Sequence, residues 1–162
     1  MVKLPHCRPC DSHNPRCDIR LREAALRFRR TQDPPLITLE YLGKINVTAW
    51  LYRDKQGIEG IKVNPNTTIA ELLEHFGPAA TPDAEVGIRS EAKAADWFRL
   101  KGNLRVPQIF SERIPCPKMC APLLNNYFPG VPWYYYYDWN TWRQGGRILK
   151  WPGEILKSVY GL

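Results

Sequence analysis

The first clear hydrophobic pattern in the chain is helical and covers residues 18–30. Its apolar positions recur at i, i+3, i+4 and i+7, which is the spacing of a single helix face. These positions are Leu21, Ala24, Ala25 and Phe28. Asp18 stands where a helix N-cap is expected, and three arginines at the other end suit the negative C-terminus of a helix. We interpret these arginines as a solvated helix face, with contact to phosphates as the alternative: Arg27, Arg29 and Arg30.

Two segments with a period of two come next, and they predict a β-hairpin. Residues 36–42 and 45–53 alternate between apolar and polar side chains, which is typical of half-buried strands. Gly43-Lys44 separates the two segments and is the expected turn. After a second turn at 54–57, residues 58–63 predict a third, shorter strand.

The rest of the chain alternates between helix and strand signals. Such alternation after a hairpin favours an α/β fold with a mixed sheet of about five strands and helices on both faces. We expect residues 18–162 to form one domain of this kind and residues 1–17 to be an irregular leader. The expected later elements are helices at 67–76, 90–101, 115–127 and 153–160, and strands at 106–112, 131–138 and 148–151.

The overall charge adds a preference for anionic partners. The chain has 162 residues and a formal net charge of +7, which favours nucleic acid but also fits a merely soluble basic protein. No apolar run approaches the ~20 residues of a membrane span, and the N-terminus lacks the apolar core of a signal peptide. We therefore expect no membrane partner and a cytoplasmic place of action, unless a longer chain carries this piece elsewhere.

A cluster of metal-binding residue types lies near the N-terminus. Cys7, Cys10, His13 and Cys17 offer four zinc ligands, with a spacing tighter than that of the usual zinc fingers. A structural zinc site and a loose leader with free thiols are both compatible with this pattern. The chain has five cysteines, and an odd number gives no complete disulfide framework.

A second pair of cysteines opens the helix expected at 115–127. Cys116 and Cys120 are four residues apart, so one helix face carries both, and two thiolates there can chelate one metal ion. The N-terminus of a helix favours the thiolate form that zinc requires. The alternative is a pair of buried structural cysteines.

Glu91 stands at the start of the preceding helix, separated from Cys116 by one helix and one strand. That connection can return the chain so that both helix starts lie at one edge of the sheet. A carboxylate beside a zinc-bound water can take its proton and pass it to a leaving amine. The alternative is an acid that only complements the helix macrodipole.

The sequences at these two helix starts resemble those of a known protein superfamily. The segments S-E-A-K-A-A-D-W and I-F-S-E-R-I-P-C-P-K-M-C-A-P-L-L resemble the zinc-dependent nucleic acid and nucleotide deaminase superfamily, and most of all the deaminase domains of bacterial polymorphic toxins. The motifs cover residues 87–128, and the order of elements extends the resemblance to 18–138. It implies a three-layer cytidine deaminase-like fold that consists of a helix, a hairpin and then alternating strands and helices.

The resemblance also implies a reaction and a site. The reaction is the hydrolytic deamination of a nucleobase in DNA or RNA, with cytosine favoured over adenine and DNA over RNA. Glu91 matches the proton shuttle of the superfamily, and Cys116 and Cys120 match its two cysteine ligands to Zn²⁺. A toxin domain would act in the cytoplasm of a target cell after secretion in a larger protein, and it would have an immunity protein as partner.

The chain departs from the superfamily pattern at two points. Arg89 occupies the position of the expected His or Cys ligand, and the cysteines are spaced C-x3-C rather than C-x2-C. Arginine cannot ligate zinc. A residue such as His75, or one from the N-terminal cluster, can supply the third ligand. The chain can instead be an inactive form, or a nucleic-acid or nucleotide binder in which Arg89 contacts phosphate.

Several other residues are candidates for contact with the substrate. The strand at 131–138 is rich in aromatic residues that could stack on a base, and the hairpin is expected to wall the substrate pocket. The substrate-binding candidates are Asn46, Trp50, Arg89, Ser111 and Trp133. We also expect basic residues to surround the site: Arg99, Lys101, Arg105, Arg113 and Lys118.

Overall fold

The computed structural model describes residues 7–9, 18–65, 90–113, 126–137, 143–144, 147–148 and 151–162. The helices in this part are α1 (Ile19–Thr31), α2 (Leu39–Lys44), α4 (Ser90–Lys101) and α7 (Pro152–Tyr160). The strands are β1 (Cys7–Pro9), β2 (Val47–Arg53), β3 (Glu59–Pro65), β4 (Arg105–Arg113), β5 (Trp133–Tyr137), β6 (Arg143–Gln144) and β7 (Arg147–Ile148).

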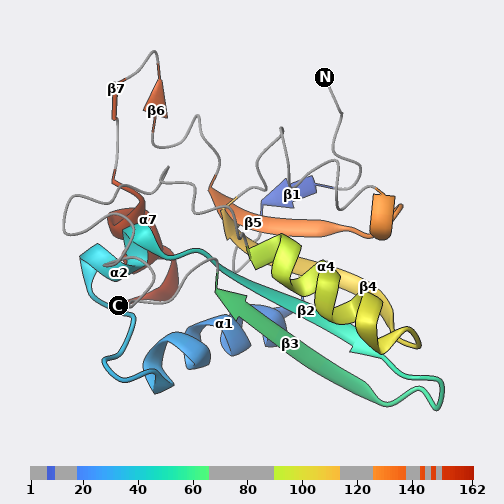
Figure 1. Cartoon of the computed structure of the whole chain (residues 1–162). Helices are drawn as coiled ribbons and strands as arrows, with labels where there is room; N and C mark the ends of the chain where they lie inside the picture. The colour runs from blue at the N-terminus through green and yellow to red at the C-terminus, as the bar shows by residue number, and fades with distance from the viewer. Residues whose placement is uncertain are drawn as a thin grey trace.

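The centre of the molecule is a mixed open sheet (Figure 1). Strand β2 lies between β3 and β4 and runs antiparallel to both, whereas β5 runs parallel to β4. At the far edge, the short β1 pairs in parallel with β5. The predicted α/β class and mixed sheet are therefore confirmed. The prediction of irregular structure for 1–17 was wrong at Cys7–Pro9, because these residues pair with Trp133 and its neighbours.

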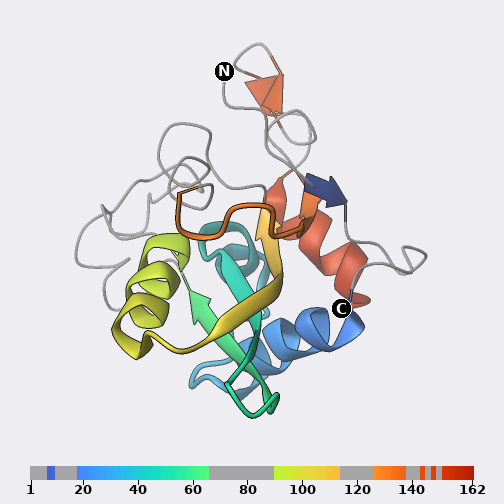
Figure 2. The same ribbon diagram turned by 90° about the vertical axis from the view of Figure 1, so that its right-hand side faces the viewer.

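Helices pack on both faces of the sheet, as the sequence predicted (Figure 2). On one face, Leu21 and Ala25 of α1 pack with a buried cluster that includes Val47, Ala49 and Phe110. On the other face, α4 contributes Ala94 and Phe98 to a second cluster with Trp50, Val106, Ile109 and Trp133. We call these the α1 face and the α4 face. Alternating residues of β2 and β4 supply the two clusters because successive strand side chains point to opposite faces.

The hairpin exists, but it is formed by the second and third predicted strands. Strands β2 and β3 pair from Val47↔Pro65 to Arg53↔Glu59. Asp54 closes the turn between them, because its carboxylate accepts hydrogen bonds from the backbone N–H of Gln56 and of Ile58, both at 2.9 Å. Asp54 thus supplies the side-chain-to-backbone bonds that stabilise tight turns.

The predicted strand at 36–42 was wrong, because α2 occupies Leu39–Lys44. Thr38 caps this helix by accepting a hydrogen bond from the Tyr41 backbone N–H at 3.3 Å. The helix then packs against α7, where Leu42 is fully buried beside Ile155 and Leu156. Gly43 is not a turn residue but a contact residue: a Cβ there would lie 2.8 Å from Nε1 of Trp151. A tertiary contact with a distant helix, made through Leu42 and Gly43, therefore stabilises this segment as a helix.

Helix α1 is confirmed almost at the predicted bounds, with Asp18 as its N-cap. Helix α7 likewise confirms the closing helix expected at 153–160. The strand expected at 148–151 differs, since β7 covers only Arg147–Ile148 and pairs with β6 in a separate two-stranded sheet. The helix predicted at 67–76 and most of the one predicted at 115–127 lie outside the described residues.

Candidate functional site

The start of α4 and the end of β4 lie at the same end of the sheet. Only residues 102–104 separate Lys101 from Arg105, and Gly102 takes a left-handed backbone conformation with φ of 72° as the chain reverses. So short a connection makes β4 run back along α4, which Figures 1 and 2 both show. Glu91, the second residue of α4, therefore stands at the end of the sheet where β4 finishes with Glu112 and Arg113.

A group of aromatic residues fixes α4 on the sheet. The ring of Phe98 lies 5.6 Å from that of Trp50 and 5.8 Å from that of Phe128, measured between centroids. Trp97 adds a contact with the ring of Tyr52 at 5.7 Å. Tilted and edge-to-face aromatic pairs of this kind contribute about 0.5–1.5 kcal/mol each beyond the area they bury. The packing of Trp50 explains why α4, and with it the backbone at Glu91, has a defined position.

Five polar residues gather on the α4 face at this end of the sheet, and we call them the polar cluster. They are Asn46, Thr48, Asn64, Ser111 and Arg113. Their grouping follows from the strand register, which pairs Thr48 with both Asn64 and Ser111. Most of the cluster is buried, with Thr48 0% and Ser111 1% exposed. Buried polar groups of this density need hydrogen-bond partners to be stable.

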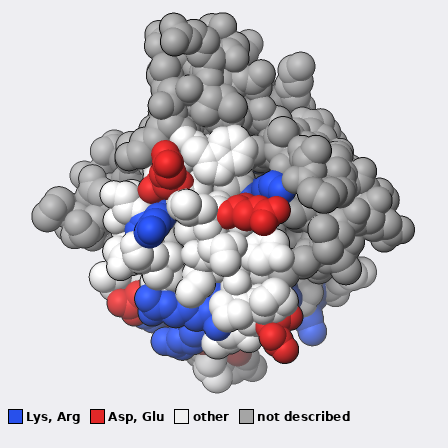
Figure 3. Space-filling model, turned by 90° about the vertical axis from the view of Figure 1, so that its left-hand side faces the viewer, with Lys and Arg blue, Asp and Glu red and all other residues white. Residues whose placement is uncertain are grey.

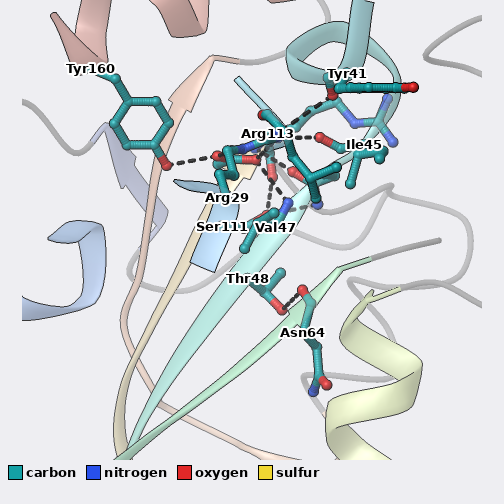
Figure 4. Close-up of polar contacts among 12 residues, drawn as sticks. Arg29, Tyr41, Ile45, Val47, Thr48, Asn64, Ser111, Arg113 and Tyr160 are labelled. Carbon is teal, nitrogen blue, oxygen red and sulfur yellow. Dashed lines mark hydrogen bonds and ion pairs between the residues drawn. The ribbon is translucent and has the colours of Figure 1, made fainter. Parts of the chain in front are cut away.

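Half of the polar cluster links the end of β4 to the start of β2 (Figure 4). Asn46 donates from Nδ2 to Oγ of Ser111 at 3.3 Å and accepts from the backbone N–H of Arg113 at 3.1 Å. Ser111 in turn donates to the carbonyl oxygen of Arg113 at 2.5 Å. The two substrate-binding candidates Asn46 and Ser111 are thus brought into contact, and they shape the last residues of β4.

The other half of the polar cluster joins β2 to β3. The Trp50 indole donates from Nε1 to Oγ1 of Thr48 at 2.9 Å, and Thr48 donates to the carbonyl oxygen of Asn64 at 3.2 Å. Trp50 itself is 0% exposed. Its polar edge and both faces of its ring are therefore occupied by the protein in this structure.

Two buried donors on the α4 face have no hydrogen-bond partner within the described part of the chain. They are Nδ2 of Asn64 and Nε1 of Trp133, and Trp133 is 2% exposed. Trp133 pairs with Ile109 in the register of β5 and β4, so it belongs to the same face as the polar cluster. Buried donors without an acceptor are rare in folded proteins, and each costs about 1–3 kcal/mol. They mark positions at which a bound group with acceptor atoms would be stabilised.

On the α1 face, the same end of the sheet carries a buried ion pair. Arg29 and Glu112 are both 0% exposed, and Nη2 of Arg29 lies 2.6 Å from Oε1 of Glu112. The guanidinium makes a second bond to Glu112 at 2.8 Å and also donates to the carbonyl oxygens of Leu36, Tyr41 and Ile45. The carboxylate further accepts from the Val47 backbone N–H at 2.8 Å.

Tyr160 completes this group, which we call the Arg29 network (Figure 4). Its hydroxyl donates to Oε2 of Glu112 at 2.7 Å. Burial, followed by the neighbouring carboxylate of Glu112, raises the pKa of Tyr160 well above its ordinary value. The network ties α1, α2, β2, β4 and α7 together around one carboxylate at the end of β4.

The prediction of a solvated face for all three arginines of α1 was wrong for Arg29. Leu21, Ala25 and Arg29 recur every four residues, so they share one buried stripe. That spacing is the signal by which the sequence could have revealed a buried cation. A buried arginine requires an acid, and the strand at 106–112 ends in Glu112, two residues after Phe110 and therefore on the same strand face as that apolar side chain.

The remaining predicted residues divide into two groups. His75, Arg89, Cys116 and Cys120, together with Cys10, His13 and Cys17, lie outside the described residues, and of Glu91 and Cys7 only the backbone is described. By contrast, Arg99, Lys101 and Arg105 are described at the opposite end of α4 and β4 from Glu91. The expectation that they surround the site was wrong, because a helix rises ~1.5 Å per residue and carries Arg99 about 12 Å along its axis from Glu91.

Comparison with protein-family models, curated proteins and solved structures finds no significant match to this chain. Within the described residues, no three His, Cys, Asp or Glu side chains are grouped so that they could hold a metal ion. The helices of that same part are all too short or too polar to cross a membrane. The site is therefore interpreted from its own geometry.

Proposed function

We propose that this protein deaminates a nucleobase hydrolytically, as a zinc-dependent enzyme of the cytidine deaminase-like kind. The observation that carries the proposal is that the α4 start, which holds Glu91, and the end of β4, three residues before Cys116, lie towards the same end of the sheet (Figure 1). Three residues span at most about 11 Å, so Cys116 stays close to this end of the sheet whatever path the chain takes. Beside it lie the buried polar cluster and Trp133, where Nδ2 of Asn64 and Nε1 of Trp133 have no hydrogen-bond partner among the described residues.

The order of the described elements supports the same proposal. Two helices, an antiparallel hairpin, a helix and two parallel strands follow one another as α1, α2, β2, β3, α4, β4 and β5. Apart from the short α2, this is the order that the resemblance implies: a helix, a hairpin and then alternating strands and helices. The agreement depends on topology and not only on the two short motifs.

The candidate metal ligands are of the chemical types that zinc prefers. Two cysteine thiolates spaced by one helical turn are typical zinc ligands, and a catalytic site needs a third protein ligand, for which His75 is our candidate. Zinc, when bound, would supply a Lewis acid that makes water a nucleophile near neutral pH. Arg89 adds a permanent positive charge close to this point of the sequence.

Residues of the chain itself would transfer the proton, position β4 and bind the base. Glu91 would take a proton from the attacking water and return it to the exocyclic amine, which leaves as ammonia while the ring carbon gains a carbonyl oxygen. Asn46 and Ser111 would hold the end of β4 in place. The donors of Asn64 and Trp133, which have no acceptor within the described ranges, would offer hydrogen bonds to acceptor atoms of the base.

The proposal includes a biological setting. A deaminase of this kind would act on DNA, or else on RNA, with cytosine as the favoured base. As a toxin domain it would work in the cytoplasm of a target cell, and an acidic immunity protein would complement its net charge of +7.

Arg89 favours one alternative, a catalytically inactive module that binds nucleic acid or a nucleotide on the same scaffold. Arginine takes the place of a metal ligand there and is well suited to contact phosphate. This alternative predicts tight binding without bound metal and without product.

One experiment separates the two. We would measure bound zinc and the formation of uracil and inosine on single-stranded DNA, double-stranded DNA and RNA. Glu91→Gln should lower turnover by at least ~100-fold, the usual contribution of a general acid–base group. Glu154→Gln is the matched control, since Glu154 is an exposed acid in the first turn of α7. Wild-type protein that binds nucleic acid but holds no zinc and forms no product would overturn the enzyme and support the module.

A further inference from the structure

A cavity of about 610 Å³ lies between α1 and α7, away from the polar cluster. Its lining includes Arg22, Glu23, Arg27, Arg30, Thr31 and Tyr160. Figure 2 shows α1 and α7 side by side, with α4 on the far side of the sheet. A cavity of this size falls within the range of about 300–1,000 Å³ that is usual for small-molecule sites. Three of its seven described lining residues are arginines.

The protein holds Arg22 in a fixed orientation. Its Nε donates to the hydroxyl of Tyr136, and its Nη2 donates to the carbonyl oxygen of Val159 at 2.8 Å. The guanidinium carbon also lies 5.8 Å from the ring centroid of Tyr160 and 6.0 Å from that of Tyr136. Aromatic faces attract a guanidinium and hold it in place. One wall of the cavity is therefore a positive charge whose position is set before any ligand arrives.

The other two arginines remain available to a ligand. Arg27 and Arg30 are exposed and three residues apart, so neighbouring positions of one helix face carry them. Within the described part of the chain, neither guanidinium forms an ion pair. Glu23 is the one acid among the described lining residues, which leaves the lining with an excess of two positive charges. In Figure 3, Lys and Arg side chains gather in the lower part of the molecule. Helix α1 lies at the same height in Figure 1.

We propose that this cavity binds phosphate groups of a nucleotide or of a nucleic-acid strand. Arg27 and Arg30 would donate pairs of parallel hydrogen bonds to phosphate oxygens, for which the planar guanidinium is well shaped. The fixed charge of Arg22 adds attraction from the wall of the cavity. The hydroxyl of Tyr160 takes no part, because Glu112 already accepts its hydrogen bond.

This site is independent of the proposed deaminase site. It lies on the α1 side of the sheet, whereas Glu91 and the polar cluster belong to the α4 face. A nucleic-acid strand whose phosphates bind in this cavity would hold the polynucleotide more tightly, and the cavity would not contact the reacting base. Binding is therefore best measured in the Glu91→Gln background, so that loss of deamination and loss of phosphate binding are read separately.

The test compares two charge-matched double variants. Arg27→Gln/Arg30→Gln removes two charges from the cavity, and Lys55→Gln/Arg105→Gln removes two exposed charges elsewhere. Fluorescence anisotropy with a labelled 12-nucleotide single-stranded DNA would give Kd at several salt concentrations. We expect the cavity variant to bind at least tenfold more weakly and the control to bind within about threefold of the parent. The salt slope should fall in magnitude by about 1.4 for two lost phosphate contacts on a single strand.

Calorimetry with a deoxynucleoside monophosphate distinguishes the two sources of phosphate. Weak mononucleotide binding that disappears in the cavity variant would support a nucleotide site, whereas binding of the 12-mer alone would support a strand site. Equal weakening by both double variants would overturn the proposal, because net charge alone would then explain the affinity. Unchanged binding in the cavity variant, with the fold verified by circular dichroism, would overturn it as well, as would a parent protein that binds neither ligand.

Discussion

The Arg29 network on the α1 face and the polar cluster on the α4 face lie at the same end of the sheet. The two groups differ in how many of their hydrogen-bond donors are used. In the Arg29 network, five hydrogen bonds leave the guanidinium of Arg29, which equals its number of N–H donors. In the polar cluster on the α4 face, the donor of Asn64 has no described partner, and neither has that of the nearby Trp133. A network whose donors are all used holds elements together. A cluster with a donor that no described residue uses is suited to receive a ligand.

The largest effect should come from breaking the ion pair. Arg29→Met leaves the carboxylate of Glu112 buried with only the Val47 backbone N–H and the Tyr160 hydroxyl as described donors. Removing one partner of a buried pair costs about 3–5 kcal/mol because the other charge stays buried without compensation. Urea denaturation should therefore show a loss of this size in the free energy of unfolding.

The double variant Arg29→Met/Glu112→Leu serves as the control for that measurement. It replaces both charges by apolar groups of similar volume, a change that is often neutral or stabilising in other proteins. We expect it to be more stable than Arg29→Met alone. If the single and double variants lose equal stability, packing and not charge explains the role of Arg29.

An intermediate effect should follow from Tyr160→Phe. The change removes the donor at 2.7 Å from Oε2 of Glu112 and leaves the rest of the ring in place. A hydrogen bond to a charged group contributes about 1.5–3 kcal/mol, so the unfolding free energy should fall by that amount. Turnover should stay at the parent level, because Tyr160 lies on the α1 face and the proposed deaminase site on the α4 face. A loss of turnover in a fully folded variant would contradict the separation of the two faces.

The same tyrosine makes stability depend on alkaline pH. Burial, and after it the carboxylate of Glu112, raises the pKa of Tyr160 above the value of 10.0 expected in the unfolded chain. The unfolded state therefore loses this proton first, and the stabilisation is complete below pH 10 and declines as the pH rises above it. Urea midpoints between pH 9 and 11 should fall more steeply for the parent than for Tyr160→Phe. Identical slopes would contradict the raised pKa.

Local periodicity was enough to predict the elements that lie against the core. Helices α1 and α4 and strands β4 and β5 follow from apolar spacing and from stops such as Gly102. The segment around α2 was mispredicted because the helix is selected by its packing against α7, more than a hundred positions later in the chain. Period-two alternation over so few residues cannot distinguish a short strand from a helix turn that a distant partner selects.

The candidate site was predicted only in part, because some of its contacts depend on partners that are distant in the sequence. Asn46 and Ser111 were both proposed as substrate contacts, and the pairing of β2 with β4 brings them together. Nothing in a single sequence shows that Asn64 joins them, because strand register decides it. Arg29 was misjudged since a charged residue on a helix is usually solvated, and only its spacing from Leu21 and Ala25 indicated burial. Contacts set by register or by distant charge partners lie beyond local patterns.

The smallest effect, and the sharpest test of the comparison, comes from one substitution made at two buried tryptophans. Trp50→Phe and Trp133→Phe delete the same atoms at positions that are 0% and 2% exposed. The indole of Trp50 donates to Thr48, whereas that of Trp133 has no described acceptor. Losing the satisfied bond should therefore make Trp50→Phe less stable than Trp133→Phe by about 1 kcal/mol. In turnover the order should reverse, with KM for single-stranded DNA rising in Trp133→Phe because the spare donor is then missing. Equal losses of stability with unchanged KM would mean that the donor of Trp133 serves no ligand, and the α4 face would then lose one of the two donors by which it differs from the Arg29 network.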